Sequence, residues 1–165
     1  MDHQIYILVI EDELEVMDAL IKDLEDFEDI FPIESANNTE EAQLIVSNII
    51  ESGDEIGLIL CDHVLPGQNG VDFLISLESQ QDFIHTKKVL VTGQAGLEDT
   101  VSAINKANLN YYISKPWTNS GFHEVVIKQL TDFVIERKLN PLKFMGLLDS
   151  VRLSEAMRNN LLTDN

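Results

Sequence analysis

The sequence predicts an α/β fold in which five parallel strands alternate with five helices and form a doubly wound sheet. Three short, nearly continuous apolar runs have the character of strands that are buried on both faces of a parallel sheet. Longer segments with apolar residues at helical spacing separate these runs. The order of strand then helix repeats five times, which implies right-handed crossovers and helices on both faces.

The predicted strands fall into a strong and a weak group. The strong group consists of the apolar runs Ile5–Ile10, Gly57–Cys61 and Lys88–Thr92. The weak group consists of Phe31–Ala36 and Tyr111–Ser114, which are more polar or shorter. Ligands in such folds bind beyond the carboxyl ends of the strands, where the strand order reverses, so we expect the chemistry in the loops that follow them.

The predicted helices begin with two segments of clear apolar periodicity. Leu14–Phe27 carries apolar residues three and four positions apart, and Ala42–Ile50 does the same. The second segment follows Asn38 and Glu41, which have the spacing of a capping box. The remaining helices are expected over Val71–Ser79, Leu97–Ala107 and Gly121–Arg137.

The C-terminal segment is predicted to be separate from the fifth helix. Asn140-Pro141 should end that helix, because proline disfavours the helical conformation in the residue before it. One or two short helices are expected over Leu142–Asn165, with an apolar side formed by Phe144, Leu147, Leu148, Val151 and Leu153. We therefore expect one domain over residues 1–138 and, over 139–165, an extension or the start of a linker to an output module.

Composition and charge argue against several classes of function. The net charge is −18, with 29 acidic and 11 basic residues, so no broad basic surface is expected for direct nucleic-acid binding. The first apolar run is too short for the core of a signal sequence or for a membrane span. A single cysteine gives no internal disulfide and suits a reducing cytoplasm, where we expect the protein to be located.

Three carboxylates are predicted to lie at the carboxyl ends of the first and third strands. Glu11 and Asp12 follow the first strand, and Asp62 follows the third. Acidic residues are common in loops, so each is weak evidence alone, but together they would concentrate about three negative charges in one crevice. Such a site needs a cation, and hard oxygen ligands without a histidine or cysteine partner point to Mg²⁺.

A hydroxyl and an ammonium group are expected at the same edge of the sheet. Thr92 ends the fourth strand and is followed by small residues, while Lys115 ends the fifth strand and precedes Pro116. A threonine hydroxyl and a lysine ammonium directed into an acidic metal pocket would bind the oxygens of a phosphoryl group. The five side chains together therefore predict a phosphoryl site.

Four stretches of the sequence resemble the receiver domains of two-component response regulators. They are Val9–Glu13 (VIEDE), Leu58–Gly70 (LILCDHVLPGQNG), Val89–Gly93 (VLVTG) and Tyr111–Pro116 (YYISKP). The acid pair, Asp-x-x-x-Pro-x-x-x-Gly, Thr-small and Lys-Pro occur in the family's order and spacing, and the resemblance covers about residues 4–138. It implies a flavodoxin-like sheet with strand order 2-1-3-4-5.

The resemblance also implies a role for each residue that matches the family's motifs. Asp62 would be the nucleophile that becomes an aspartyl phosphate. Asp12 would bind Mg²⁺ directly, Glu11 would assist through water, and Val64 would offer its backbone carbonyl to the metal.

The remaining matches imply a switch. Thr92 would bond to one phosphoryl oxygen and Lys115 would pair with another. Tyr112, three residues before Lys115, would rotate inward when Thr92 moves toward the phosphoryl group. Pro116 is expected to follow a cis peptide bond, and Gly70 to support the turn before the third helix with a positive φ.

The family implies a signalling function with protein partners. The phosphoryl donor would be a histidine kinase or a phosphotransfer protein, and the protein would catalyse only its own phosphorylation and dephosphorylation. Output would follow from docking or homodimer formation through the fourth helix, the fifth strand and the fifth helix.

Two other functions remain open at this point. A HAD-like phosphohydrolase would also use an aspartyl phosphate, but such enzymes place a second aspartate two residues after the nucleophile, where this chain has Val64. A flavodoxin-like cofactor binder is disfavoured, because no glycine-rich phosphate loop follows the first strand.

Three residues near the motifs are expected to have no chemical role. Cys61 is expected to be a small core residue rather than a redox thiol. His63 is expected to be solvated, as histidines at the start of a loop usually are. Trp117 is expected to pack at the start of the fifth helix.

Overall fold

The fold is a five-stranded parallel sheet with helices on both faces. The computed structural model describes residues 3–93 and 96–163, so Gln94 and Ala95 lie outside the described residues. The strand order is β2-β1-β3-β4-β5, which confirms the predicted topology. The strands are β1 (Ile5–Ile10), β2 (Ile33–Ala36), β3 (Glu55–Cys61), β4 (Lys87–Thr92) and β5 (Tyr111–Ser114).

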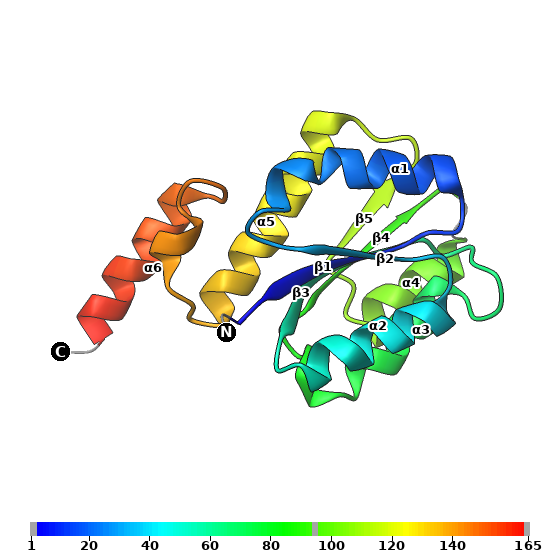
Figure 1. The fold of residues 1–165 in the computed structure, drawn as a ribbon, viewed down its shortest axis with the longest axis horizontal. Coiled ribbons are helices and arrows are strands. Elements are labelled where there is room, and N and C mark those ends of the chain that lie inside the picture. The colour runs from blue at the N-terminus through cyan, green and yellow to red at the C-terminus, as the bar shows by residue number, and fades with distance from the viewer. Residues whose placement is uncertain (1–2, 94–95, 164–165) are drawn as a thin grey trace.

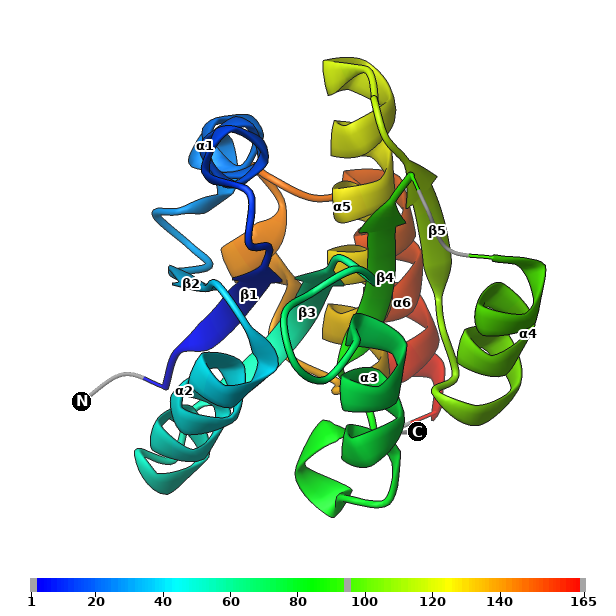
Figure 2. The same cartoon turned by 90° about the vertical axis from the view of Figure 1, so that its right-hand side faces the viewer.

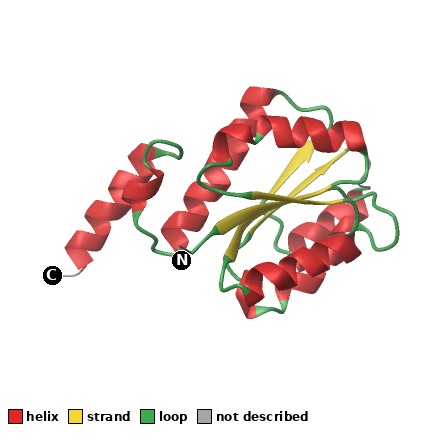
Figure 3. Ribbon diagram, viewed as in Figure 1, coloured by secondary structure: helices red, strands yellow, loops and turns green. Residues whose placement is uncertain are grey.

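The helices form a layer on each side of the sheet. They are α1 (Leu14–Asp23), α2 (Thr39–Glu51), α3 (Gly70–Glu78), α4 (Leu97–Lys106), α5 (Asn119–Glu136) and α6 (Ser150–Thr163). Figure 1 shows α1 and α5 on one face and α2, α3 and α4 on the other. The view in Figure 2 and the colouring by secondary structure in Figure 3 show the same three layers. Among the described residues, no helix has the length and apolarity needed to cross a membrane.

Two apolar cores, one on each face of the sheet, hold these layers together. Side chains alternate between the two faces along each strand, so Ile7 and Val9 of β1 enter the core beneath α1 and α5. Leu8 and Ile10 enter the other core, beneath α2, α3 and α4. Because both faces of the central strands are buried, the strands appear in the sequence as continuous apolar runs.

The predicted cap of α2 is present. The side-chain oxygen of Asn38 accepts a hydrogen bond from the Glu41 backbone N–H at 2.8 Å. The carboxylate of Glu41 in turn accepts a hydrogen bond from the Asn37 backbone N–H at 2.6 Å. The two side chains therefore satisfy backbone donors at the start of the helix, although the return bond goes to the residue before the cap.

The predicted end of the first helix was wrong, and so was the predicted cause of the end of the fifth. The first helix ends at Asp23, and a 3₁₀ turn over Glu25–Phe27 replaces its last turn. The helix α5 ends at Glu136, four residues before Asn140. Lys138 takes a left-handed conformation with φ 54, and the Leu139 N–H bonds to the carbonyl of Val134 at 3.1 Å. This Schellman geometry ends the helix before the proline can act.

The C-terminal segment turns back against α5. A 3₁₀ turn over Pro141–Phe144 precedes α6, which lies beside the second half of α5 (Figure 1). The ring of Phe144 stacks on Phe31 with a centroid distance of 5.5 Å, and Leu148 and Leu153 are buried in the same core. Val151 is 66% exposed, so its predicted place on the apolar side was wrong.

Polar contacts also attach the C-terminal segment to α5. A guanidinium nitrogen of Arg152 lies 2.5 Å from a carboxylate oxygen of Asp132. The backbone N–H of Asp149 donates to the hydroxyl of Thr131 at 3.2 Å. Burial raises the pKa of the Asp132 carboxyl, but its hydrogen bonds to Lys128 and Arg152 outweigh that effect and lower the pKa overall.

Candidate functional site

The sheet brings three carboxylates together at its carboxyl edge. The strands β1 and β3 are neighbours in parallel register, with Ile10 opposite Cys61. The residues that follow, Glu11 and Asp62, therefore leave the sheet side by side. Glu11, Asp12 and Asp62 each place a carboxylate oxygen within 4.8 Å of the others. Among the described residues this is the one group of three or more acidic, histidine or cysteine side chains with the spacing of a metal site.

Lys115 reaches the same cluster from the end of β5. Its ammonium nitrogen lies 2.7 Å from an oxygen of Glu11 and 3.1 Å from an oxygen of Asp62. Glu11 and Asp62 are buried, whereas Asp12 is exposed. The peptide bond between Lys115 and Pro116 is cis, as predicted. Lys115 therefore contacts two of the three carboxylates, and both of these are removed from water.

The titration of these groups reflects their burial and their charges. Burial raises the pKa of the Glu11 carboxyl, and the charge of Asp62 adds to this effect, while the hydrogen bond from Lys115 partly opposes it. Burial lowers the pKa of the Lys115 ammonium, but its hydrogen bonds to Glu11 and Asp62 outweigh this and raise the pKa overall. The site therefore keeps an excess of negative charge that a further cation would offset.

The donor set of the cluster fits Mg²⁺. All three side chains offer carboxylate oxygens, and Mg²⁺ prefers such hard ligands to nitrogen or sulfur. Asp12 is exposed, which leaves one side of the cluster open to water and to a phosphate oxygen. The side chains of Glu11, Asp12 and Asp62 could thus hold Mg²⁺ at an open site.

Gly70 packs directly against the backbone of Asp62. A β-carbon built on Gly70 would lie 1.8 Å from the carbonyl oxygen of Asp62, closer than any real contact. The N–H of Gly70 donates to the carbonyl of His63 at 2.9 Å. The predicted positive φ at Gly70 was wrong: in this loop it belongs to Gly67, with φ +79. Position 70 needs glycine because two backbone segments approach each other there.

Thr92, Tyr112 and Val64 surround the cluster. Thr92 is buried at the end of β4, and its carbonyl oxygen accepts a hydrogen bond from the Tyr112 hydroxyl at 3.1 Å. The half-buried Tyr112 packs against the core beneath α4. The backbone N–H of Val64 lies 3.4 Å from a carboxylate oxygen of Asp62, and the Val64 side chain is 49% exposed.

His63 is the site neighbour that sequence reasoning missed. Its side chain is only 10% exposed, so the expected solvation was wrong. Nε2 of His63 lies 3.1 Å from a carboxylate oxygen of Asp99, in the first turn of α4. The two residues are 36 positions apart in the sequence, so a local sequence pattern does not predict their contact. Cys61, in contrast, is a buried core residue as expected, and burial raises the pKa of its thiol.

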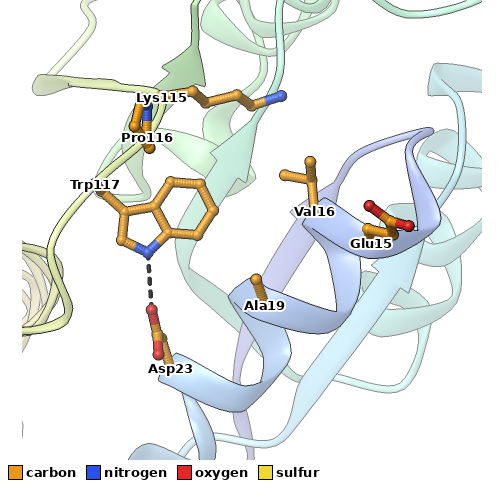
Figure 4. A pocket seen from close by; sticks show the side chains of 7 residues that line it. All are labelled: Glu15, Val16, Ala19, Asp23, Lys115, Pro116 and Trp117. Carbon is orange, nitrogen blue, oxygen red and sulfur yellow. Dashed lines mark hydrogen bonds between the residues drawn. The ribbon is translucent and has the colours of Figure 1, made fainter.

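A groove beside Lys115 runs between α1 and the start of α5. Its volume is about 510 Å³, and its lining consists of Glu15, Val16, Ala19, Asp23, Lys115, Pro116 and Trp117. The indole N–H of Trp117 donates to the carboxylate of Asp23 at 2.8 Å (Figure 4). Trp117 also lies against Phe122 with a ring-centroid distance of 5.8 Å, which confirms its expected packing at the start of α5.

Known proteins resemble this chain in both sequence and structure. The family model of the response regulator receiver domain matches residues 7–127. The chemotaxis protein CheY-3 of Vibrio cholerae is 27% identical over 132 residues, which cover 79% of this chain and 92% of that protein. The hydrogenase transcriptional regulatory protein HoxA of Cupriavidus necator is 30% identical over 116 residues, 70% of this chain. The chain spans only 22% of the length of HoxA.

Solved structures show the same fold. A CheY-like response regulator receiver domain protein from Methanospirillum hungatei has a TM-score of 0.69 and 27% identity, covering 82% of this chain and 99% of that one. The signal receiver domain of an HD domain-containing protein from Pseudomonas fluorescens has a TM-score of 0.71 and 21% identity, covering 84% and 95%. The match of the family model, the strand order and the shared fold lead to one conclusion: the chain belongs to the response regulator receiver domain family.

Proposed function

We propose that the protein is a phosphorylation-controlled switch in which Asp62 accepts a phosphoryl group from a histidine kinase or phosphotransfer protein, with Mg²⁺ bound beside it. Receiver domains belong to two-component signalling, and the comparisons support that class of function. The observation that carries the proposal is the ammonium of Lys115, 3.1 Å from a buried Asp62 carboxylate inside an acidic cluster.

The transfer step follows from the position of Asp62. One of its carboxylate oxygens is held by Lys115, and the other faces the N–H of Val64, so the carboxylate is oriented before the donor arrives. A new P–O bond forms to Asp62 while the P–N bond of the donor phosphohistidine breaks, and the leaving imidazole keeps the electron pair.

Charge neutralisation is the second requirement of this step. Mg²⁺ held by Glu11, Asp12, Asp62 and the Val64 carbonyl would offset charge on the phosphoryl oxygens. Lys115 exchanges its contact with a carboxylate for one with a phosphoryl oxygen, and the hydroxyl of Thr92 bonds to another.

The groove of Figure 4 gives the donor protein a place to bind beside the reacting group. Val16, Ala19 and Trp117 supply apolar surface, and Lys115 lies at the end nearest Asp62. The exposed Glu15 and the half-buried Asp23 place acidic groups on the α1 side of the groove. A donor with apolar and basic side chains on its docking face would complement this surface.

Output is transmitted from Thr92 to β5 and α4, on the side of Thr92 away from the acidic cluster. Movement of Thr92 toward the phosphoryl group draws Tyr112 inward, because the Tyr112 hydroxyl is bonded to the Thr92 backbone. Val101 and Ile104 on α4 and Tyr111 on β5 are large apolar side chains that are about half exposed. They provide the surface for a partner protein or a second copy through α4, β5 and α5.

A phosphohydrolase function has less support. Val64 occupies the position where such enzymes carry a second aspartate, and its exposed apolar side chain has no group to activate water. Sustained hydrolysis of small phosphate esters that depends on Asp62 would favour the phosphohydrolase and contradict the switch. A cytoplasmic location stays a prediction.

Phosphorylation of Asp62 is tested by mass. Incubation with acetyl phosphate and Mg²⁺ should add the mass of one phosphoryl group to the wild type and none to Asp62→Asn. Asp82→Asn, which changes an exposed acid at the far end of the fold, should be modified like the wild type. Modification of Asp62→Asn to the same extent would exclude Asp62 as the acceptor.

Mg²⁺ should stabilise the folded protein by binding the acidic cluster. At a hundredfold excess over its dissociation constant, the ion would raise the free energy of unfolding by about 2.7 kcal/mol. Calorimetry in Mg²⁺ and in EDTA should therefore show a higher midpoint with the metal for the wild type and a much smaller shift for Asp12→Asn. An equal shift in Asp12→Asn would show that the ion binds elsewhere.

A further inference from the structure

His63 connects the loop after β3 to the first turn of α4. A carboxylate only accepts hydrogen bonds, so Nε2 of His63 carries the proton that it shares with Asp99 at 3.1 Å. Asp99 lies on α4 two residues after the helix begins and is about half exposed, whereas the imidazole is nearly buried. The bond therefore joins an interior side chain of the loop to the surface of a helix.

The backbone of His63 is held at the centre of the candidate site. It lies between Asp62 and Val64, and its carbonyl accepts the hydrogen bond from Gly70 at the start of α3. The peptide units on either side of His63 belong to Asp62, which would receive the phosphoryl group, and to Val64, whose carbonyl would bind Mg²⁺, so a shift of either unit would reach His63 directly. Because the ring is little exposed and bonded to Asp99, such a shift would be passed to α4 and not absorbed by rotation of the ring into solvent.

The state of the other ring nitrogen argues against a purely stabilising role for this placement. With the proton on Nε2, Nδ1 of a neutral ring is a hydrogen-bond acceptor. Nδ1 is buried and has no hydrogen-bond partner within residues 3–93 and 96–163. A buried acceptor without a donor disfavours the folded state, so an apolar ring of similar size would suit the position at least as well.

We propose that His63 is a positioning residue that couples the phosphoacceptor loop to α4 through its hydrogen bond to Asp99. When residues 62–64 adjust to the phosphoryl group and Mg²⁺, the imidazole displaces the first turn of α4 and with it the exposed side chains of Val101 and Ile104. This route differs from the one through Thr92 and Tyr112, which passes through a side chain of β5. The inference rests on the proposed function, since it requires an event at Asp62.

The test compares chemistry at the site with the response of α4. His63→Phe keeps a ring but removes both the bond to Asp99 and the unpaired acceptor, so the midpoint of thermal unfolding should stay equal or rise. Asp99→Ala breaks the same bond from the other end. Glu98→Ala removes an exposed acid from the same first turn and serves as the matched control for the loss of a helix-terminal charge.

Two readouts are taken with and without beryllofluoride and Mg²⁺. Fluorescence of Trp117, the one tryptophan of the chain, reports occupancy from its position two residues after Lys115. Hydrogen exchange of the backbone amides of residues 97–106 reports α4. We expect the wild type and every variant to bind beryllofluoride with similar midpoints. Exchange in α4 should change severalfold in the wild type and Glu98→Ala, and much less in His63→Phe, in Asp99→Ala and in the double variant.

The outcomes separate the two proposals. A wild type that neither binds beryllofluoride with Mg²⁺ nor is phosphorylated contradicts the proposed function itself. A wild type that binds, with an undiminished α4 response in His63→Phe, overturns the coupling role of His63 and leaves the switch intact. A smaller α4 response in the His63→Phe, Asp99→Ala double variant than in either single variant would likewise overturn it. If the two residues act only through their shared hydrogen bond, either substitution alone already removes the whole effect.

Discussion

Replacing Gly70 by alanine should lower the free energy of unfolding by about 3 kcal/mol or more, since overpacking against a fixed backbone is among the strongest destabilising changes. The new methyl carbon would lie 1.8 Å from the Asp62 carbonyl oxygen, and backbone offers no rotamer by which to withdraw. The variant could fold only if the loop between β3 and α3 moved away from the backbone of Asp62. That movement would displace Asp62 and abolish phosphorylation. Urea denaturation and phosphorylation by acetyl phosphate measure the two effects.

Gly67→Ala provides the control within the same loop. Gly67 has φ +79, but a methyl group added there would meet nothing within 4 Å, so the substitution should cost only about 1 kcal/mol from backbone strain. Phosphorylation should survive in this variant. A Gly70→Ala protein as stable and as reactive as Gly67→Ala would show that the close approach of the two backbone segments does not constrain the site.

Lys115→Met should destabilise the protein by roughly 2–3 kcal/mol near neutral pH, less than for a fully buried ion pair because the lysine side chain is 18% exposed. The change leaves the carboxylates of Glu11 and Asp62 buried together without their cation. Mg²⁺ should restore much of the loss, since it supplies the missing positive charge. Urea titrations in EDTA and in Mg²⁺ measure both effects, and equal losses in the two would contradict this account.

The loss in Lys115→Met should also depend on pH in a defined direction. The folded-state pKa of Glu11 lies above its ordinary value of 4.5, and losing the hydrogen bond from Lys115 raises it further. A group with a raised folded-state pKa contributes stability below its unfolded value and loses that contribution as the pH rises through the folded value. Stability in EDTA should therefore fall more from pH 5 to pH 8 in the variant than in the wild type.

Lys128→Met is the matched control for the loss of a lysine. Lys128 pairs with Asp132 at 2.8 Å on the surface of α5, and its side chain is 62% exposed. Exposed pairs at this helical spacing contribute about 0.3–0.5 kcal/mol, so neither Mg²⁺ nor pH should change the small effect much.

The parts of the fold that local patterns govern were predicted well. The boundaries of β1 and β5 agree with the prediction, and β3 and β4 differ only at their first residues. A strand that is buried on both faces consists of consecutive apolar residues, so its limits can be recognised in the sequence. The cluster of Glu11, Asp12 and Asp62 followed from strand ends and resemblance, because parallel pairing places the residues after neighbouring strands side by side.

The features that depend on how elements meet could not be predicted. The end of α5 is set by a left-handed Lys138, a residue type that carries no such preference. Exposure of Val151 depends on which side of α6 meets α5. The bond between His63 and Asp99 and the contact of Trp117 with Asp23 each join segments that only the assembled layers bring together.

The pairing of β1 with β3 sets the relative positions of two carboxylates of the cluster. Glu11 and Asp62 follow adjacent strands whose backbone hydrogen bonds form with the sheet, so folding alone brings the two carboxylates together before any donor or metal arrives. Thr92 and α4 lie one strand further out, toward the sheet edge. The sheet itself thus positions two carboxylates of the cluster, whereas the elements assigned to output in the proposed function lie nearer its edge.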